Sequence, residues 1–215
     1  MFSGIIEENI QILKVHKQSP ASGVLVIEIA RPKSFDDIKI GDSIAVDGVC
    51  LTLEVFDSSK MQFSLGPETL KITNWNAESL NGRKVNLERS MKLGDRIHGH
   101  IVSGHVDTLG RVEMAQLHGE AFDLVLSLDS SYRIYFPKKS SWAVAGVSLT
   151  INEVELKNGR VWVSSCLIPE TLKRTNLASL KVGQQVNVEI DFMIRTMAHA
   201  FQERFNNLNL DLGLK

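Results

Sequence analysis

The chain contains most of itself twice, and this duplication constrains its fold more than any other feature. The segment 67–74, PETLKITN, returns as PETLKRTN at 169–176, with seven of the eight positions identical. Three further repeated blocks follow the same order: 43–52 with 141–150, 2–5 with 102–105, and 85–88 with 186–189. Because four blocks recur at a nearly constant offset, the sequence predicts two copies of one domain.

The repeat length decides what kind of domain this is. A period of about 100 residues is far longer than the units of solenoids and propellers, and it is long enough for a small domain with its own core. We therefore expect a first module over residues 1–97, a second over 98–191, and a tail over 192–215 that lies outside the repeat.

Local patterns predict a chain that is mainly β. The segments 22–29 and 159–165 are rich in β-branched residues and partly alternate. Gly-Asp, Asp-Gly and Asn-Gly pairs separate short runs, which is typical of antiparallel barrels and sandwiches. Short helices are expected at 68–72 and 170–174, because each follows a proline and begins with an acidic residue.

The tail has a different pattern. Its apolar residues recur at steps of three or four and form one stripe of a helix: Ile194, Met197, Phe201, Phe205 and Leu208. A helix with so narrow a stripe needs a surface to lie against. The stripe either packs on the two modules or joins subunits. Its position outside the repeat, where it cannot complete either module, favours assembly.

The composition is that of an ordinary globular chain, with 43% hydrophobic and 23% charged residues. The formal net charge of −1 gives no support for a nucleic-acid or membrane surface. The N-terminus lacks the order of a signal peptide, and no apolar run approaches the roughly 20 residues that cross a bilayer. Cys50 and Cys166 do not correspond in the two copies, which excludes a repeated disulfide and favours a reduced, cytoplasmic protein.

The densest ionisable segment is His98 to His105, HGHIVSGH, at the junction of the copies. We expect His98 and His100 on one face of a strand, which would suit a metal. No acidic or cysteine partner stands at a metal-ligand spacing, so histidines that bind or move protons in a pocket are favoured. Phosphate loops, zinc motifs and nucleophile elbows are missing from the sequence.

The two copies differ in polar chemistry at matching positions. The pairs, first copy and then second, are Cys50 with Ser148, Ile5 with His105, and Ser90 with Asp191. Such differences are expected if the copies perform different tasks. The alternatives are ordinary structural roles, with Cys50 as a small buried hydrophobe and Thr52 and Thr150 as strand residues.

Five segments together resemble the riboflavin synthase family: MFSGIIEE at 1–8, DGVCLT at 47–52, GHIVSGH at 99–105, GVSLT at 146–150 and IPET at 168–171. The resemblance extends from Met1 through the tail. It implies two tandem six-stranded Greek-key β-barrels and a C-terminal α-helix, assembled as a homotrimer through the helices. It also implies a dismutation of two 6,7-dimethyl-8-ribityllumazine molecules. One donates a four-carbon unit to the other, which gives riboflavin and 5-amino-6-ribitylaminouracil without a metal or redox cofactor.

The resemblance also implies two substrate pockets. The first would be lined by Gly4, Ile5, Ile6, Cys50, Leu51, Thr52, Ser64, Leu65, Gly66, Pro67, Glu68 and Thr69. The second would be lined by Gly104, His105, Val106, Ser148, Leu149, Thr150, Cys166, Leu167, Ile168, Pro169, Glu170 and Thr171, with Lys139 reaching in from a neighbouring subunit. Phe2 and His100 are further expected binding residues. The expected catalytic residues are Cys50, His105, Ser43, Ser148 and Asp191.

Three residues depart from the family pattern beside the expected second pocket: Trp142, Ala145 and Cys166. The main alternative is a lumazine or flavin antenna protein, which shares the fold and duplication without catalysing. Such a protein is expected to lose polar residues in one copy, whereas this chain keeps Cys50 and Ser148, so an enzyme is favoured. Association with lumazine synthase is a further partner to consider.

Overall fold

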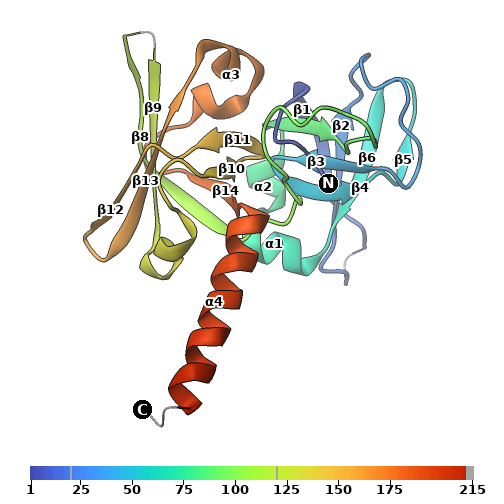
Figure 1. Ribbon diagram of the computed structural model, residues 1–215. Helices are drawn as coiled ribbons and strands as arrows, with labels where there is room; N and C mark the ends of the chain where they lie inside the picture. The colour runs from blue at the N-terminus through green and yellow to red at the C-terminus, as the bar shows by residue number, and fades with distance from the viewer. Residues whose placement is uncertain (20, 120, 212–215) are drawn as a thin grey trace.

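The computed structural model describes residues 1–19, 21–119 and 121–211, with the side chains of 118, 121 and 205–211 outside the described part. Two antiparallel β-sheets lie side by side, and a long C-terminal helix extends away from them (Figure 1). The first sheet contains β1 (Glu8–Lys17), β2 (Leu25–Ala30), β3 (Ser43–Val46), β4 (Val49–Thr52), β5 (Val55–Phe56), β6 (Lys60–Leu65) and β7 (Lys84–Arg89). Helices α1 (Pro67–Thr73) and α2 (Ala77–Leu80) connect β6 to β7.

The second copy repeats this order. Its sheet contains β8 (Thr108–His118), β9 (Ala121–Asp129), β10 (Ser141–Val144), β11 (Val147–Thr150), β12 (Glu153–Lys157), β13 (Arg160–Leu167) and β14 (Gln185–Ile190). The connections include the 3₁₀ turn η1 (Ser130–Tyr135), helix α3 (Pro169–Arg174) and the 3₁₀ turn η2 (Asn176–Ser179). The predicted short helices are confirmed as α1 and α3, and the two predicted strands as β2 and β13.

The two sheets have identical topology, β4-β3-β7-β1-β2-β6-β5 and β11-β10-β14-β8-β9-β13-β12. The order is not sequential, as in Greek-key folds. Strand β4 also contacts β6, and β11 contacts β13, so each sheet curls towards a barrel. The predicted fold class is confirmed. Each sheet has seven strands where six were expected, because a short strand, β5 or β12, pairs at the outer edge.

Each curled sheet encloses its own apolar core. Alternation along β6, where every second side chain is buried, points Met61, Phe63 and Leu65 inward. In the second copy, Trp142 is fully buried, stacks edge-on against Phe136 at 5.5 Å, and donates from Nε1 to Ser165 Oγ at 2.9 Å. Trp142 was expected beside the second pocket, but its side chain is a satisfied part of the core.

The tail forms α4 (Phe192–Asp211), which projects away from both sheets (Figure 1). Its base is held by an Arg195–Asp107 ion pair and by a 3.0 Å hydrogen bond between Tyr135 Oη and His199 Nε2. Met197 and Phe201 stay 52% and 68% exposed. Phe205 and Leu208, also predicted in the stripe, have side chains outside the described part. No helix within that part is both long and apolar enough to cross a membrane.

Candidate functional site

The two copies exchange the short segments that precede their first strands. Residues 2–6 are the leading segment of the first copy, and residues 102–106 are the leading segment of the second. Phe2 and Val102 pair as an antiparallel bridge, with their N–H and C=O groups bonded in both directions at 2.8 and 3.0 Å. Each chain segment therefore crosses the other where the two sheets meet.

Beyond this crossing, each leading segment completes the opposite copy. The Ser148 amide donates to the Gly4 carbonyl at 2.8 Å, and the Cys50 amide donates to the Gly104 carbonyl at 2.8 Å. Gly4 (φ +74°) and Gly104 (φ +82°) adopt a left-handed conformation that favours glycine. An added Cβ would lie 2.6 Å from Ser148 Cβ at Gly4, and 2.5 Å from Cys50 Cβ at Gly104, so only glycine fits at both crossings.

This exchange corrects the expected division into pockets. Ile6 is buried in the core of the second copy, although it was predicted to line the first pocket. Val106 packs against the core of the first copy, although it was predicted to line the second pocket. The alignment of Gly4 with Gly104 identifies equivalent positions, but it does not say which sheet each segment contacts. The structure groups 4–6 with Ser148, and 104–106 with Cys50.

Two buried carboxylates hold the exchanged segments. Glu88 accepts from the Ser3 amide at 2.6 Å, the Ser3 hydroxyl at 2.8 Å and the Gly4 amide at 3.0 Å. Glu189 accepts from the Ser103 amide at 2.6 Å, the Ser103 hydroxyl at 2.7 Å and the Gly104 amide at 2.9 Å. Burial raises the pKa of both glutamates, and the hydrogen bonds oppose that shift.

Sequence reasoning did not single out these two glutamates. The signal was present, because VNLE at 85–88 and VNVE at 186–189 place a repeated acid in an apolar strand pattern. A buried acid that recurs in both copies must be hydrogen-bonded to be tolerated. The repeated Asn86 and Asn187 act similarly at the contact between the copies. Asn86 donates to the Ala145 carbonyl at 3.0 Å, and Asn187 to the Asp47 carbonyl at 2.9 Å.

Ala145, which was expected beside the second pocket, lies at the contact between the copies. It occupies the turn between β10 and β11 with φ +47°, and Asp47 occupies the matching turn with φ +44°. Asp47 is fully buried and accepts from the Asn86 amide at 2.8 Å and from Arg83 at 2.8 Å. The turn thus has the same backbone conformation in both copies, but only the first copy has a charged side chain there, that of Asp47.

The matched positions 50 and 148 differ in their side-chain partners. Ser148 Oγ lies 2.7 Å from His100 Nδ1, whereas among the described residues no histidine bonds the Cys50 thiol. Burial lowers the pKa of His100, and the charge of Asp191 opposes this. The Ser148 hydroxyl and the His100 imidazole therefore form a candidate proton-exchanging pair.

The remaining predicted residues occupy varied positions. His105 is exposed, and its amide donates to Ser103 Oγ at 3.3 Å. His98 and His100 do not share a strand face as predicted, because the chain bends at 98–99 and exposes His98. Asp191 Oδ1 caps the first turn of α4 by accepting from the Met193 amide at 2.8 Å. Lys139 is exposed with φ +70°.

The residues predicted to line the two pockets differ in how exposed they are. Thr52 and Thr150 are exposed at the ends of β4 and β11, whereas Leu51 and Leu149 are buried in the two cores. Leu65 and Leu167 are core residues as well. The other predicted residues of these segments are at least partly exposed: Ser64, Gly66, Pro67, Glu68, Thr69, Cys166, Ile168, Pro169, Glu170 and Thr171.

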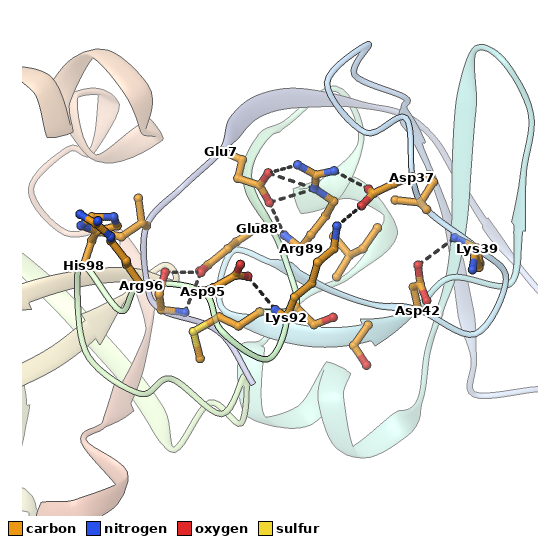
Figure 2. Close-up of a pocket in the computed structure, with 17 residues that line it drawn as sticks. Glu7, Asp37, Lys39, Asp42, Glu88, Arg89, Lys92, Asp95, Arg96 and His98 are labelled. Atoms are coloured by element: carbon orange, nitrogen blue, oxygen red, sulfur yellow. Dashed lines mark hydrogen bonds and ion pairs between the residues drawn. The ribbon is translucent and has the colours of Figure 1, made fainter.

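A separate polar cleft of about 710 Å³ lies beside the end of β7 (Figure 2). Of the predicted catalytic residues only Ser43 lines it, together with the Ser3, Ile5 and Glu88 side chains. Neither Cys50 nor Ser148 lines this cleft, although Ser43 lies on β3, the strand that pairs with the strand of Cys50. No group of three histidine, cysteine or acidic side chains that could hold a metal ion occurs in the described part of the chain.

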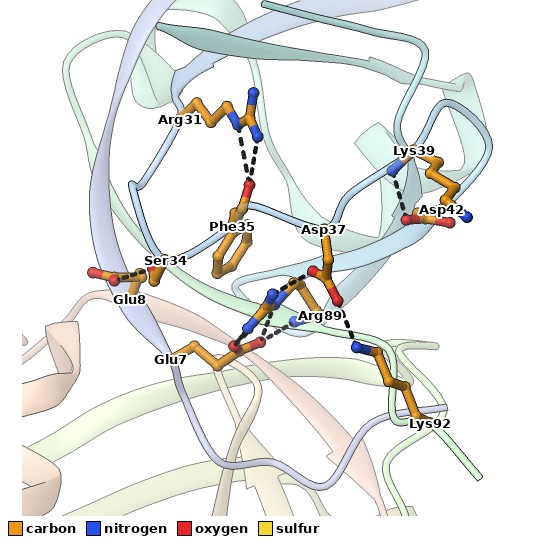
Figure 3. A network of polar contacts seen from close by, with 10 residues as sticks. All are labelled: Glu7, Glu8, Arg31, Ser34, Phe35, Asp37, Lys39, Asp42, Arg89 and Lys92. Atoms are coloured by element: carbon orange, nitrogen blue, oxygen red, sulfur yellow. Dashed lines mark hydrogen bonds and ion pairs between the residues drawn. The ribbon is translucent and has the colours of Figure 1, made fainter. Parts of the chain in front are cut away.

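An ion-pair network borders this cleft (Figure 3). Arg89 bonds Glu7 and Asp37, each at 2.5 Å, and Lys92 bonds Asp37 at 2.5 Å. Hydrogen bonds from Lys92 and Arg89 lower the pKa of Asp37 to about 2. The second copy has a matching device, in which Asp107 accepts from Arg195 and from the Ile190 amide. Glu7 and Asp107 directly follow the two leading segments. By accepting from the backbone amides of Arg89 and Ile190, they fix the ends of these segments to β7 and β14.

Two sheets of identical topology, with Cys50 and Ser148 at matched positions, make this a duplicated β-domain protein. The chain belongs to the lumazine binding domain family, whose model matches residues 3–90 and again residues 103–191.

Similar proteins were found by sequence and by structure. A protein named riboflavin synthase from Actinobacillus pleuropneumoniae is 37% identical over 98% of this chain and 97% of its own length. One of the same name from Bacillus subtilis is 37% identical over 96% and 92%. A crystal structure of LumP complexed with riboflavin has a TM-score of 0.74 at 22% identity, covering 88% of this chain and 99% of that one. This last likeness concerns the fold alone.

Proposed function

We propose that this protein is a riboflavin synthase, a transferase that converts two 6,7-dimethyl-8-ribityllumazine molecules into riboflavin and 5-amino-6-ribitylaminouracil. One observation carries the proposal. The Gly4–Ser148 and Gly104–Cys50 contacts build two sites with the same backbone geometry and different side chains. A reaction between two identical molecules in different roles, donor and acceptor, requires such a pair of sites.

The catalytic gain would come mainly from positioning. Holding two reactants in the correct orientation is worth up to about 7–11 kcal/mol of the activation barrier in favourable cases. The exchange of leading segments fixes residues beside Cys50 and Ser148 by backbone hydrogen bonds, so both sites are largely preformed. No metal or redox cofactor enters the proposed reaction, since a transfer between two molecules of one compound needs no external oxidant.

We assign the proposed binding residues by the grouping that the exchange creates. The first site would combine 104–106 with Cys50, Leu51, Thr52 and residues 64–69. The second would combine 4–6 with Ser148, Leu149, Thr150 and residues 166–171, and Lys139 would reach it from a neighbouring subunit. Cys50 and Ser148 face the exchanged segments directly and are the strongest catalytic candidates, with His105, Ser43 and Asp191 as weaker ones.

The quaternary arrangement is part of the proposal. We infer a cytoplasmic homotrimer in which α4 joins subunits, because the Met197 and Phe201 side chains have little to cover them within one chain. Each productive site would pair the first copy of one subunit with the second copy of the next. The division into 1–97, 98–191 and 192–215, and an association with lumazine synthase, are retained as proposals.

The direct test is to incubate the pure protein with 6,7-dimethyl-8-ribityllumazine alone and to quantify products. We expect riboflavin and 5-amino-6-ribitylaminouracil in equal amounts. Tight lumazine binding without turnover would instead establish the antenna function, which the fold shared with LumP keeps as the second candidate. The retained polar residues Cys50 and Ser148 favour the enzyme, because a binding protein has no need of both.

A further inference from the structure

His100 is a partly buried histidine whose two ring nitrogens are in different situations. Nδ1 lies 2.7 Å from Ser148 Oγ, a short hydrogen bond. Nε2 is buried and has no partner among the described residues. A neutral imidazole has one N–H and one lone pair, so one of these two groups on His100 is unsatisfied whichever tautomer is present. A buried polar group without a partner calls for a physical reason, and a role in proton transfer is one such reason.

The neighbours of His100 bear on its proton. Burial lowers the pKa of His100, which keeps the imidazole neutral and able to accept a proton near pH 7. The negative charge of Asp191 opposes this shift and would stabilise the imidazolium form. The Ser148 hydroxyl is the polar group that bonds the ring, and Gly99 leaves room for it, since a Cβ there would be 2.9 Å from Ser148 Oγ.

This arrangement exists in the second copy only. The backbone of Cys50 makes the same contact with Gly104 that Ser148 makes with Gly4. Among the described residues, the Cys50 side chain instead packs with an apolar cluster that includes Phe2 and Val102. The two sites therefore share a scaffold, but among the described residues only the Ser148 side chain is hydrogen-bonded to an imidazole.

Building on the proposed function, we propose that His100 is a positioning residue that makes the second-copy site the proton-accepting one. His100 Nδ1 holds the Ser148 hydroxyl as an acceptor for a proton from the bound lumazine. In that step the substrate bond to hydrogen breaks and a new bond to Ser148 Oγ forms. The original hydroxyl proton moves to Nδ1, which leaves a substrate anion and an imidazolium that faces the charge of Asp191.

Two substitutions separate this role from a structural one. In His100→Asn, the shorter amide can still bond Ser148 but cannot take up a proton. In His100→Gln, the longer amide occupies the region of Nε2 and leaves Ser148 without its partner. We expect kcat to fall about 10²-fold or more in both, the usual contribution of a proton-transfer group. Lumazine affinity, measured by ligand fluorescence, should change less than threefold in His100→Asn.

The pH dependence gives an independent readout. The acidic limb of the kcat profile should vanish in His100→Asn. It should move to lower pH in Asp191→Asn, which removes the charge and keeps an oxygen to cap α4. Ser148→Ala should lose as much activity as His100→Asn, and the double variant should lose no more, because the pair acts as one unit. His16→Asn is the matched control, since His16 also has a buried ring nitrogen without a partner but lies on β1; its profile should be unchanged.

The outcomes are distinguishable. A His100→Asn protein with wild-type kcat and an unchanged acidic limb would overturn this inference while leaving the proposed function intact. A wild-type protein that binds lumazine and forms no riboflavin would overturn the proposed function first. If His100→Gln fails to fold, the Ser148→Ala and Asp191→Asn profiles still decide the matter.

Discussion

The Cys50 amide donates a hydrogen bond to the Gly104 carbonyl at 2.8 Å, so a segment of the second copy completes the first. The reciprocal bond from Ser148 to Gly4 has the same length. The backbone at Cys50 in the first copy, and at Ser148 in the second, is therefore hydrogen-bonded to a segment of the other copy. The exchanged segments therefore tie the two copies together at both matched positions.

Gly104→Ala should destabilise the protein strongly. The new Cβ would meet Cys50 Cβ at 2.5 Å and Cys50 N at 3.0 Å, and the φ of +82° is unfavourable for alanine. We expect the free energy of unfolding in urea to fall by about 3 kcal/mol or more. Gly183→Ala is the control, because its φ is +90° and nothing lies within 4 Å of the added Cβ. That variant should lose only about 1 kcal/mol, and an equal loss in both would contradict the crowding at Gly104.

Glu88→Gln should loosen the leading segment of the first copy. The Ser3 and Gly4 amides donate to different oxygens of Glu88, and glutamine replaces one of these oxygens with an NH2 group, so one donor is left unsatisfied at a cost of about 1–3 kcal/mol. Amide hydrogen exchange should accelerate at Gly4, which packs on the second copy, and remain slow at Gly104. Glu189→Gln should give the reverse. The claim fails if either substitution loosens both segments equally.

The same two glutamates set a pH dependence. Burial raises their folded pKa above the ordinary 4.5, so the folded state binds protons more strongly than the unfolded state. The free energy of unfolding must then decline as pH rises from about 4.5 through the raised values. Asp37 acts in a separate window, since its lowered pKa of about 2 removes stability only as pH falls below its ordinary 3.8. Urea midpoints above pH 4.5 should decline more steeply in the wild type than in Glu88→Gln.

Several features of the fold could be predicted from the sequence because they are local or repeated. A proline followed by an acid marks α1 and α3, and β-branched runs mark β2 and β13. The offset near 100 residues separates the two sheets. These signals depend on neighbouring residues or on the internal repeat, so one amino-acid sequence is sufficient to detect them.

The exchange could not be predicted from the same information. Gly4 and Gly104 are equivalent in the repeat, and equivalence is preserved whether each contacts its own copy or the other. Only the three-dimensional crossing of Phe2 and Val102 decides between these arrangements. The partners of His100 and Trp142 were missed for a related reason, since Ser148 and Ser165 are distant in sequence.

Assembly through α4 can be tested without disturbing the subunit. Phe201→Glu replaces a side chain that is 68% exposed, so a single chain should fold normally. In sedimentation velocity we expect the wild type to be a trimer and Phe201→Glu to be a monomer with little activity. Glu203→Ala, on the same helix, is a control that should leave the assembly intact. A Phe201→Glu protein that stays trimeric would show that subunits join elsewhere.

Cys50 and Ser148 should respond differently to exchange of their side chains. Cys50→Ser should reduce turnover about tenfold or more if the thiol takes part in the reaction, because thiol and hydroxyl differ by several pKa units and in nucleophilicity. Ser148→Cys should have a smaller effect, since a thiol can still donate to His100. Circular dichroism and lumazine fluorescence would establish that both proteins fold and bind. Normal turnover in Cys50→Ser would make Cys50 a packing residue.

The most direct test of two unequal sites acting together is a complementation measurement. Cys50→Ser and Ser148→Ala proteins, each of low activity, are mixed in urea, refolded and assayed with 6,7-dimethyl-8-ribityllumazine. If each productive site pairs the first copy of one subunit with the second copy of another, some mixed assemblies contain an intact Cys50 facing an intact Ser148. Activity should then rise well above that of either protein refolded alone. Mixed trimers that form and show no gain would contradict the paired-site mechanism.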